Sequence, residues 1–308
     1  MALKKIFPLE KFVVEAQKVI VGKEYELKLA LCCLLARGHL LIEDLPGMGK
    51  TSFVLFLSRV LDLPHKRVQF TNDLLPADII GTQILSEDRK SFRFHRGPLF
   101  SELVLADELN RGTPKTQSAL LQAMEERSVT VDGETFALPS PFFLIATQNP
   151  TEHAGAFPLP ESQLDRFMMR IEMGYPQKND EVEILRRGDI RGRIQELPSL
   201  INRLELLDFQ KDVDAVHSSD AILNYVQALL QTTRTSSLFK TGLSPRCGLL
   251  LLQAAKAWAL LEGRSMVLPE DVKAVAKSVM HHRLQNTQTR QNMQGLIEEL
   301  IKNTPVPV

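Results

Sequence analysis

The sequence is short of cysteine, aromatic residues and net charge, and these shortages narrow the class of protein. Of 308 residues, 6% are aromatic and three are cysteine, and the formal net charge at pH 7 is zero. An odd number of cysteines without framework spacing excludes a disulfide scaffold and favours reduced thiols, so we expect a cytoplasmic protein. Because there is no overall basic surplus, binding to nucleic acid is not expected.

Long hydrophobic runs and several catalytic signatures are missing too. No apolar stretch reaches the roughly 20 residues that span a bilayer, and the N-terminal MALKKIFPLEKF has no apolar core of signal-peptide length. We therefore expect neither export nor membrane insertion. The histidines form no H-E-x-x-H, no Cys/His set has zinc spacing, and neither G-x-S-x-G nor a kinase signature occurs.

The first half of the chain alternates short apolar runs with helical patterns. This pattern predicts strands at 39–42, 67–70, 103–106, 142–146 and 167–171, and helices at 24–37 and 50–61. Near-continuous apolar strands between helices indicate an α/β fold with a parallel sheet covered on both faces.

After about residue 190 the predicted strands stop. Residues 187–199 read as a linker, and the remaining pattern predicts helices at 218–234, 245–262 and 268–283. We therefore expect an α/β domain over residues 1–190 and a small all-α domain over residues 191–308.

Two segments break the α/β rhythm, and each predicts a β-hairpin inserted into the domain. Residues 82–97 alternate around two phenylalanines. Residues 128–138 place Asp132 and Gly133 between two alternating arms, and this dipeptide favours a tight turn in which both central residues have positive φ.

The stretch EDLPGMGKT, residues 43–51, lies between a predicted strand and a predicted helix, as a phosphate-binding loop requires. Backbone N–H groups there favour phosphate charge. Lys50 would reach the β- and γ-phosphates of ATP, and the Thr51 hydroxyl would ligate Mg²⁺. The general pattern has glycine where this chain has Asp44, which costs flexibility and adds negative charge. The candidate nucleotide-binding residues are Leu45, Pro46, Gly47, Met48, Gly49, Lys50, Thr51 and Ser52.

Polar residues follow two of the predicted buried strands. In LVLADELNR, Asp107 suits Mg²⁺, directly or through water, and Glu108 suits orienting and deprotonating an attacking water. In FFLIATQNP, Asn149 could touch the γ-phosphate or the water, although a turn-forming asparagine before Pro150 is the alternative. Both strand ends lie at the edge where open α/β sheets bind ligands.

Two arginines are further candidates. Arg166, in FPLPESQLDRFMMRI, lies between a short helix and a strand, where pairing with a local carboxylate is the alternative. Arg246, in GLSPR, lies in the first turn of a predicted helix, where the helix dipole disfavours a cation. Such a broken local rule hints at function.

The order and wording of these motifs resemble the MoxR family of AAA+ ATPases. The resemblance is carried by LIEDLPGMGKT, GPLFSELVLADELNRGTPKTQSALLQAMEERSVTVDGE, IATQNPTEHAGAFPLPESQLDRFMMRI and GLSPRCGLLLLQAAKAWALLEG, and it covers nearly the whole chain. Many members have an acidic residue at the position of Asp44. Two departures are Lys23, where the family usually has glutamine, and His95, where it often has arginine.

The resemblance implies an ATPase domain over residues 1–190 and a helical lid over residues 191–308, with both hairpins pointing toward a central pore. It implies that Asn149 is the first sensor and that Arg246 is the lid arginine that senses the γ-phosphate. Arg166 would be the arginine finger of a neighbouring site, and Val21 and Gly22 would lie near the adenine.

The leading hypothesis is an ATP- and Mg²⁺-dependent remodelling chaperone that works as a hexameric ring on clients and on partners with von Willebrand factor A domains. Three alternatives stay open: a nucleic-acid-stimulated motor, a non-hydrolysing assembly switch, and a metal-chelatase-type motor subunit.

Overall fold

A single parallel sheet organises the α/β half of the protein. The computed structural model describes residues 6–85, 91–149, 155–287 and 292–306. Within these residues the sheet has the strand order β2-β5-β8-β1-β9, and every neighbouring pair is parallel. The strands are β1 (Leu40–Glu43), β2 (His65–Gln69), β5 (Leu103–Asp107), β8 (Phe143–Gln148) and β9 (Met169–Ile171). The predicted α/β fold is confirmed, with strand ends shifted by one or two residues at most positions.

The two faces of the sheet pack against different helices. Side chains alternate along each strand, so Leu105 and Ile145 face one hydrophobic core while Val104 and Leu144 face another. The first core contains α1 (Leu9–Gln17), α2 (Glu24–Leu35) and α3 (Lys50–Val60), and it continues into the C-terminal helices. The second contains α4 (Pro76–Ile80), η1 (Pro98–Phe100), η2 (Leu109–Arg111) and α5 (Pro114–Glu126).

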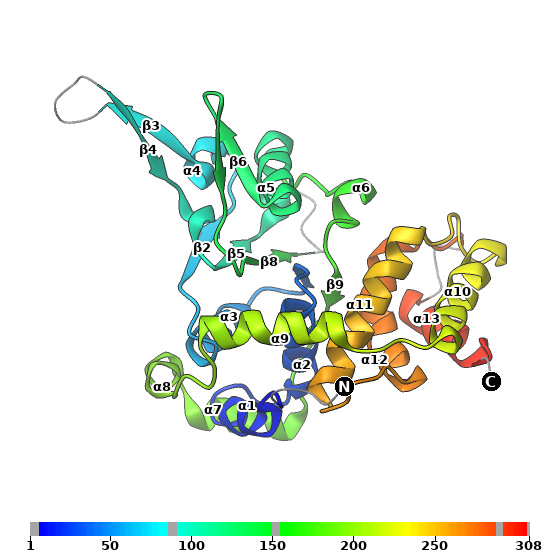
Figure 1. Ribbon diagram of the computed structural model, residues 1–308. Coiled ribbons are helices and arrows are strands. Elements are labelled where there is room, and N and C mark those ends of the chain that lie inside the picture. Colours follow the sequence, from blue (N-terminus) through cyan, green and yellow to red (C-terminus); the bar gives the residue numbers. More distant parts are fainter. Residues whose placement is uncertain (1–5, 86–90, 150–154, 288–291, 307–308) are drawn as a thin grey trace.

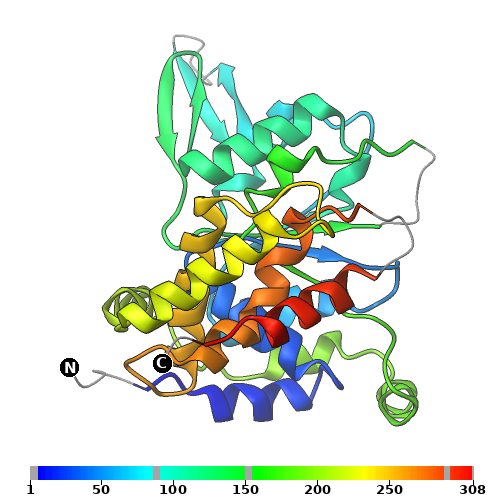
Figure 2. The same ribbon diagram turned by 90° about the vertical axis from the view of Figure 1, so that its right-hand side faces the viewer.

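Both predicted hairpins form, and they project from the same end of the molecule (Figures 1 and 2). The first pairs β3 (Gly81–Leu85) with β4 (Phe92–Arg96), and the second pairs β6 (Ser128–Val131) with β7 (Glu134–Ala137). In the second turn, φ is +50° at Asp132 and +85° at Gly133. The hairpins touch through Phe94 and Phe136, whose rings stack at 4.2 Å between centroids.

The C-terminal part is helical. It contains α10 (Asp220–Thr235), α11 (Pro245–Leu261), α12 (Pro269–Met280), η3 (His281–Arg283) and α13 (Met293–Asn303). The serines at 219 and 244 cap α10 and α11, because each hydroxyl accepts a backbone N–H of the first turn. Helix α12 packs against β9, so the helical part lies directly against the edge of the sheet (Figure 1).

The segment expected to be a linker contains a helix instead. Three short helices, α6 (Glu161–Leu164), α7 (Lys178–Arg187) and α8 (Arg191–Glu196), precede the longer α9 (Arg203–Ala215). Helix α8 buries Ile194 and packs against α3. An isoleucine that anchors one turn carries too little periodicity for a helix to be recognised from sequence. The domain division at residue 190 stays a prediction. No helix in the described part of the chain is long and apolar enough to cross a membrane.

Buried His39, just before β1, predicts a loss of stability in mild acid. Its Nδ1 accepts the N–H of Leu144 at 3.0 Å, and burial lowers its pKa to about 3. The unfolded chain therefore binds a proton below about pH 6.5 that the folded chain does not bind until about pH 3, so stability falls as the pH falls through this window. From pH 7.5 to 5.5 this group alone should cost about 1.4 kcal/mol of unfolding free energy.

Urea unfolding of the wild type and of His39→Asn at both pH values measures this contribution. Asparagine offers an oxygen acceptor but does not titrate, so its pH dependence should be smaller. An unchanged pH dependence in the variant would contradict the assignment.

Candidate nucleotide-binding site

The loop between β1 and α3 exposes its backbone as a phosphate cradle would. Gly47 and Gly49 have φ values of +84° and +80°, which side chains with a Cβ rarely adopt. A Cβ built on either glycine meets no atom within 4 Å, so both face open space. Helix α3 begins directly afterwards, at Lys50. The loop therefore fits an anionic ligand that approaches its N–H groups and the positive end of α3.

Asp44 is a structural clamp. Its carboxylate is buried, with Oδ1 accepting the N–H of Leu45 at 2.7 Å and Oδ2 accepting the N–H of Gly174 at 2.6 Å. It thus ties the start of the loop to the segment that follows β9. The expectation of lost flexibility at the loop entrance fits this arrangement, and both carboxylate oxygens are occupied by backbone amides.

The side chain of Lys50 folds back toward the start of the phosphate loop. Its Nζ donates to the carbonyls of Asp44 at 2.7 Å and Leu45 at 3.1 Å. Partial burial lowers the pKa of Lys50, and the carboxylates of Asp44, Asp107 and Glu108 oppose that shift. The Lys50 ammonium is therefore close enough to Asp107 and Glu108 to interact electrostatically with their carboxylates.

A pocket of about 520 Å³ opens beside the loop. Of the predicted residues, Val21, Gly47, Met48, Gly49 and Ser52 line it. Its apolar part comes from Val19, Ile20, Met173, Ile184, Leu185 and Ile190, which is a suitable lining for a flat aromatic base.

Gly22 contributes differently from Val21. It does not line the pocket, and its φ is +68°. A Cβ there would lie 2.2 Å from a carboxylate oxygen of Asp180, near the start of α7, so another residue would displace that side chain as well as strain the backbone. Lys23, one residue later, donates from Nζ to the carbonyl of Met173 and lies at the pocket wall.

The carboxylates at the end of β5 are held by the strand beside them. The hydroxyl of Thr147, on β8, donates to Oδ1 of Asp107 at 2.6 Å and accepts the N–H of Glu108 at 2.8 Å. Glu108 has a φ of +54°, a left-handed conformation that costs a non-glycine residue energy and is often found at functional sites. Its side chain pairs with Arg111 at 3.4 Å. Thr147 therefore fixes both acidic residues at once.

Arg67 on the edge strand β2 was not anticipated. Its guanidinium donates to Oδ2 of Asp107 from Nε at 3.1 Å and from Nη2 at 2.7 Å. Both oxygens of Asp107 are thus engaged, but Oδ1 accepts a single hydroxyl and keeps a lone pair, so Asp107 would hold Mg²⁺ with Thr51 through Oδ1, directly or through bound water. The sequence showed Arg67 as the first residue of a strand, but the pairing of that strand with β5 is a tertiary feature.

Asn149 lies where the sequence placed it, at the end of β8 and next to the end of β5. It is 6% exposed, and its carbonyl accepts the side-chain amide of Asn110 at 3.3 Å. The strand order therefore brings Asp107, Glu108 and Asn149 to the same edge as the phosphate loop.

The two candidate arginines lie elsewhere, in a second pocket of about 480 Å³ that shares no lining residue with the first. Arg166 Nε and Arg246 Nη2 each lie 3.1 Å from an oxygen of Glu125, on α5. Of the described residues that line this pocket, one is acidic and five are cationic: Arg37, Arg127, Arg166, Arg246 and Lys256. The structure thus brings Arg166 and Arg246 together, but not to their own phosphate loop.

Comparison with known proteins defines the class. Residues 39–169 match the ATPase family associated with various cellular activities (AAA), and residues 231–302 match the AAA lid domain. The chain is therefore an AAA+ ATPase by family, with an α/β nucleotide-binding core and a helical lid.

The relatives narrow the class to one family. The chain is 39% identical to chaperone MoxR1 of Mycobacterium tuberculosis over 91% of this chain and 76% of that protein. It is 41% identical to the uncharacterized protein YeaC of Bacillus subtilis, over 97% and 95%. A crystal structure from Cytophaga hutchinsonii superposes with a TM-score of 0.90 at 35% identity, covering 97% of this chain and 95% of that one. The chain belongs to the MoxR family of AAA+ ATPases.

Removing the hydroxyl of Thr147 should slow ATP turnover. In Thr147→Val the side chain keeps its shape, but Asp107 and the N–H of Glu108 each lose a buried partner. We expect ATP turnover to fall by about 10-fold or more and the protein to lose about 1–3 kcal/mol of stability, with nucleotide affinity retained. Turnover and urea unfolding measure the two effects. Thr147→Ser keeps the hydroxyl and is the matched control; equal turnover in both variants would exclude the bridging role.

Proposed function

We propose that this chain hydrolyses ATP to ADP and phosphate at the loop between β1 and α3. Residues 45–52 hold the phosphates through backbone N–H groups and Lys50, while Val21 and the apolar pocket wall receive the adenine. Gly22, next in the chain, leaves room for the side chain of Asp180 near the start of α7. The open cradle at Gly47 and Gly49 beside an apolar pocket supports this proposal.

The strand ends supply the chemistry. Thr51 and Asp107 would hold Mg²⁺, which would supply positive charge beside the phosphates. Glu108 accepts the proton of the attacking water, and Asn149 orients that water. Thr147 and Arg67 hold the carboxylate of Asp107, and Thr147 also holds the backbone N–H of Glu108.

The site is completed by a neighbouring subunit in a ring, which we propose to be a hexamer. The observation that carries this proposal is that Arg166 and Arg246 share Glu125 in a cationic pocket separate from their own loop. The family resemblance implies that Arg246 senses a γ-phosphate. We propose that both arginines face the phosphates bound by the next subunit, where Arg166 stabilises transition-state charge.

Turnover should therefore depend on assembly. We expect the ATPase rate per chain to rise with protein concentration, and Arg166→Ala to lower it on the order of 10³-fold while nucleotide still binds. Glu108→Gln provides the blank.

Mixing Glu108→Gln with Arg166→Ala sharpens this test. One variant keeps the arginine and the other keeps the base, so a shared site recovers activity when both are present. A mixture no more active than its components, with a rate that does not depend on concentration, would exclude a site built between subunits.

The work done by hydrolysis is proposed to be chaperone-like remodelling of client proteins, together with partners that carry von Willebrand factor A domains. The projecting β3–β4 hairpin supports this function, because it exposes apolar side chains. Phe92 is 71% exposed, and Ile84 and Leu85 are 46% and 48% exposed. Its stacking on the β6–β7 hairpin through Phe94 and Phe136 lets both hairpins move together.

If the hairpin grips clients, its apolar side chains should matter for them. We expect Phe92→Ser with Leu85→Ser to lose most of the ATP-dependent suppression of aggregation of a chemically unfolded test protein, measured by light scattering. Leu223→Ser on α10 is the matched control, because Leu223 is 43% exposed and α10 packs against α11, α12 and α13 of the lid. Equal losses in both variants, or none in either, would remove the hairpin from client binding.

A further inference from the structure

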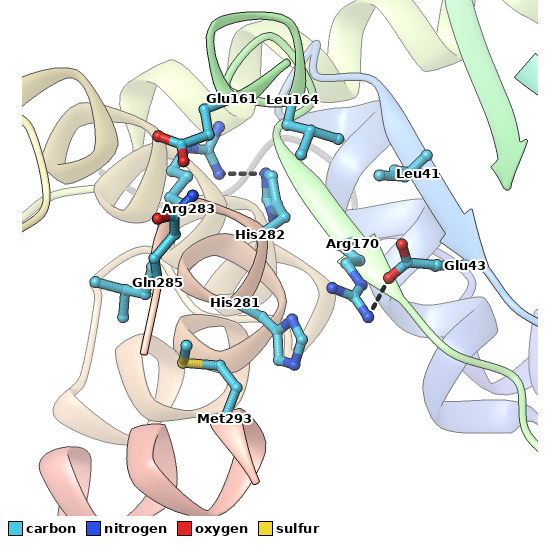
Figure 3. Close-up of a pocket in the computed structure, with 11 residues that line it drawn as sticks. Leu41, Glu43, Glu161, Leu164, Arg170, His281, His282, Arg283, Gln285 and Met293 are labelled. Carbon is cyan, nitrogen blue, oxygen red and sulfur yellow. Dashed lines mark hydrogen bonds and ion pairs between the residues drawn. The ribbon is translucent and has the colours of Figure 1, made fainter. Parts of the chain in front are cut away.

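Arg283, on η3 of the lid, is a buried arginine that the proposed chemistry does not use. Its side chain is 4% exposed. In Figure 3 it lies beside His282, whose Nε2 is 2.7 Å from Nη1 of Arg283, at one wall of a pocket that Glu43 and Arg170 line from the sheet side. A charged group this deep is costly unless each of its donors has a partner.

The partners of Arg283 form one segment of the α/β domain. Nε donates to Oδ1 of Asp165 at 2.6 Å, and Nη2 donates to the carbonyls of Asp165 at 2.8 Å and Phe167 at 2.6 Å. Nη1 donates to the carbonyl of Met168 at 3.3 Å and also, within the lid, to that of Val279 in α12. The planar fork thus grips the backbone on both sides of Arg166, a geometry that the single nitrogen of lysine cannot reproduce.

Two carboxylates, those of Asp165 and Glu125, connect the side chain of Arg283 to that of Arg166. Asp165 also lies 3.7 Å from Nε of Arg246, and Arg246 shares Glu125 with Arg166. A continuous set of charged contacts therefore runs from Arg283 in the lid to the side chain of Arg166. Movement of η3 relative to the sheet would move the backbone that carries Arg166.

We propose that Arg283 is a positioning residue for Arg166, and that through it the lid controls hydrolysis at the neighbouring subunit's site. This inference rests on the proposed shared site. Arg283 touches no part of its own nucleotide pocket, so its loss leaves that pocket and Glu108 intact and impairs the next subunit. Loss of a residue that only joins the lid to the core would not impair the next subunit's site while sparing its own.

The test uses Arg283→Lys in the full chain. We expect turnover to fall by about 10- to 100-fold, while the affinity for a fluorescent ATP analogue stays at the wild-type value. Mixed with Glu108→Gln, the variant should recover activity, because one subunit supplies the base and the other supplies a correctly held Arg166. Arg264→Lys is the matched control: this lid arginine grips Asp271 with both nitrogens and has no contact with residues 165–168 among its recorded bonds. The Arg264→Lys variant should have a lower melting temperature, and mixing it with Glu108→Gln should not raise its activity.

The pair of Glu108→Gln and Arg166→Ala, run in parallel, separates two kinds of failure. If that pair recovers activity and the Arg283→Lys pair does not, Arg283 is only a structural contact and the inference falls. If neither pair recovers, the shared site itself is wrong. Should Arg283→Lys fail to fold, Asp165→Asn decides, because it weakens one contact of Arg283, keeps the backbone carbonyls that Arg283 binds, and should recover in the same mixture; Arg246→Ala, run beside it, shows how much of the effect comes from the contact between Asp165 and Arg246.

Discussion

The pairing of β5 between β2 and β8 is the constraint on which the site depends. Parallel strands end at the same edge, so this order brings Asp107, Arg67 and Thr147 into contact from positions 40 residues apart in either direction. Each partner engages a different oxygen of Asp107. Because β5 and β8 are buried along their whole length, their register is tightly specified, whereas β2, at the edge of the sheet, is mostly exposed.

Strand order also explains why one carboxylate replaces a glycine in the phosphate loop. β1 lies between β8 and β9, so the loop leaves the sheet beside the end of β9. Asp44 uses that proximity by binding the N–H of Gly174, on the far side of β9. A glycine at this position would leave the two segments untied. The carboxylate of Asp44 therefore holds the loop by accepting hydrogen bonds from two backbone amides, and these amides offset its charge.

Local pattern was sufficient to predict the strands of the sheet, both hairpins and the residues at the strand ends, but it missed helices such as α5, α8 and α9. Lys50, Asp107 and Asn149 could be found because each follows or precedes an apolar run with a recognisable period. The turn at Asp132 and Gly133 could be found because only certain residues tolerate positive φ. Arg67, Glu125 and Arg283 could not be found this way, since each acts through a partner at least 40 residues distant or through a shared carboxylate. Their sequence surroundings resemble those of any surface arginine or glutamate, and only tertiary packing distinguishes them.

Arg246 is a residue whose sequence position hinted at function but whose partner only the folded structure can reveal. It lies in the first turn of α11, where the helix dipole adds positive potential to its own charge. With Arg166 and the other cations of the pocket, this makes a site that the carboxylates of Glu125, Asp165 and Asp214 only partly neutralise. Such a site favours an anion of higher charge than a carboxylate, and a nucleotide phosphate meets that requirement. The proposed binding of a neighbouring subunit's phosphate would explain the broken local rule at Arg246, which is the reason to seek its partner on a second subunit.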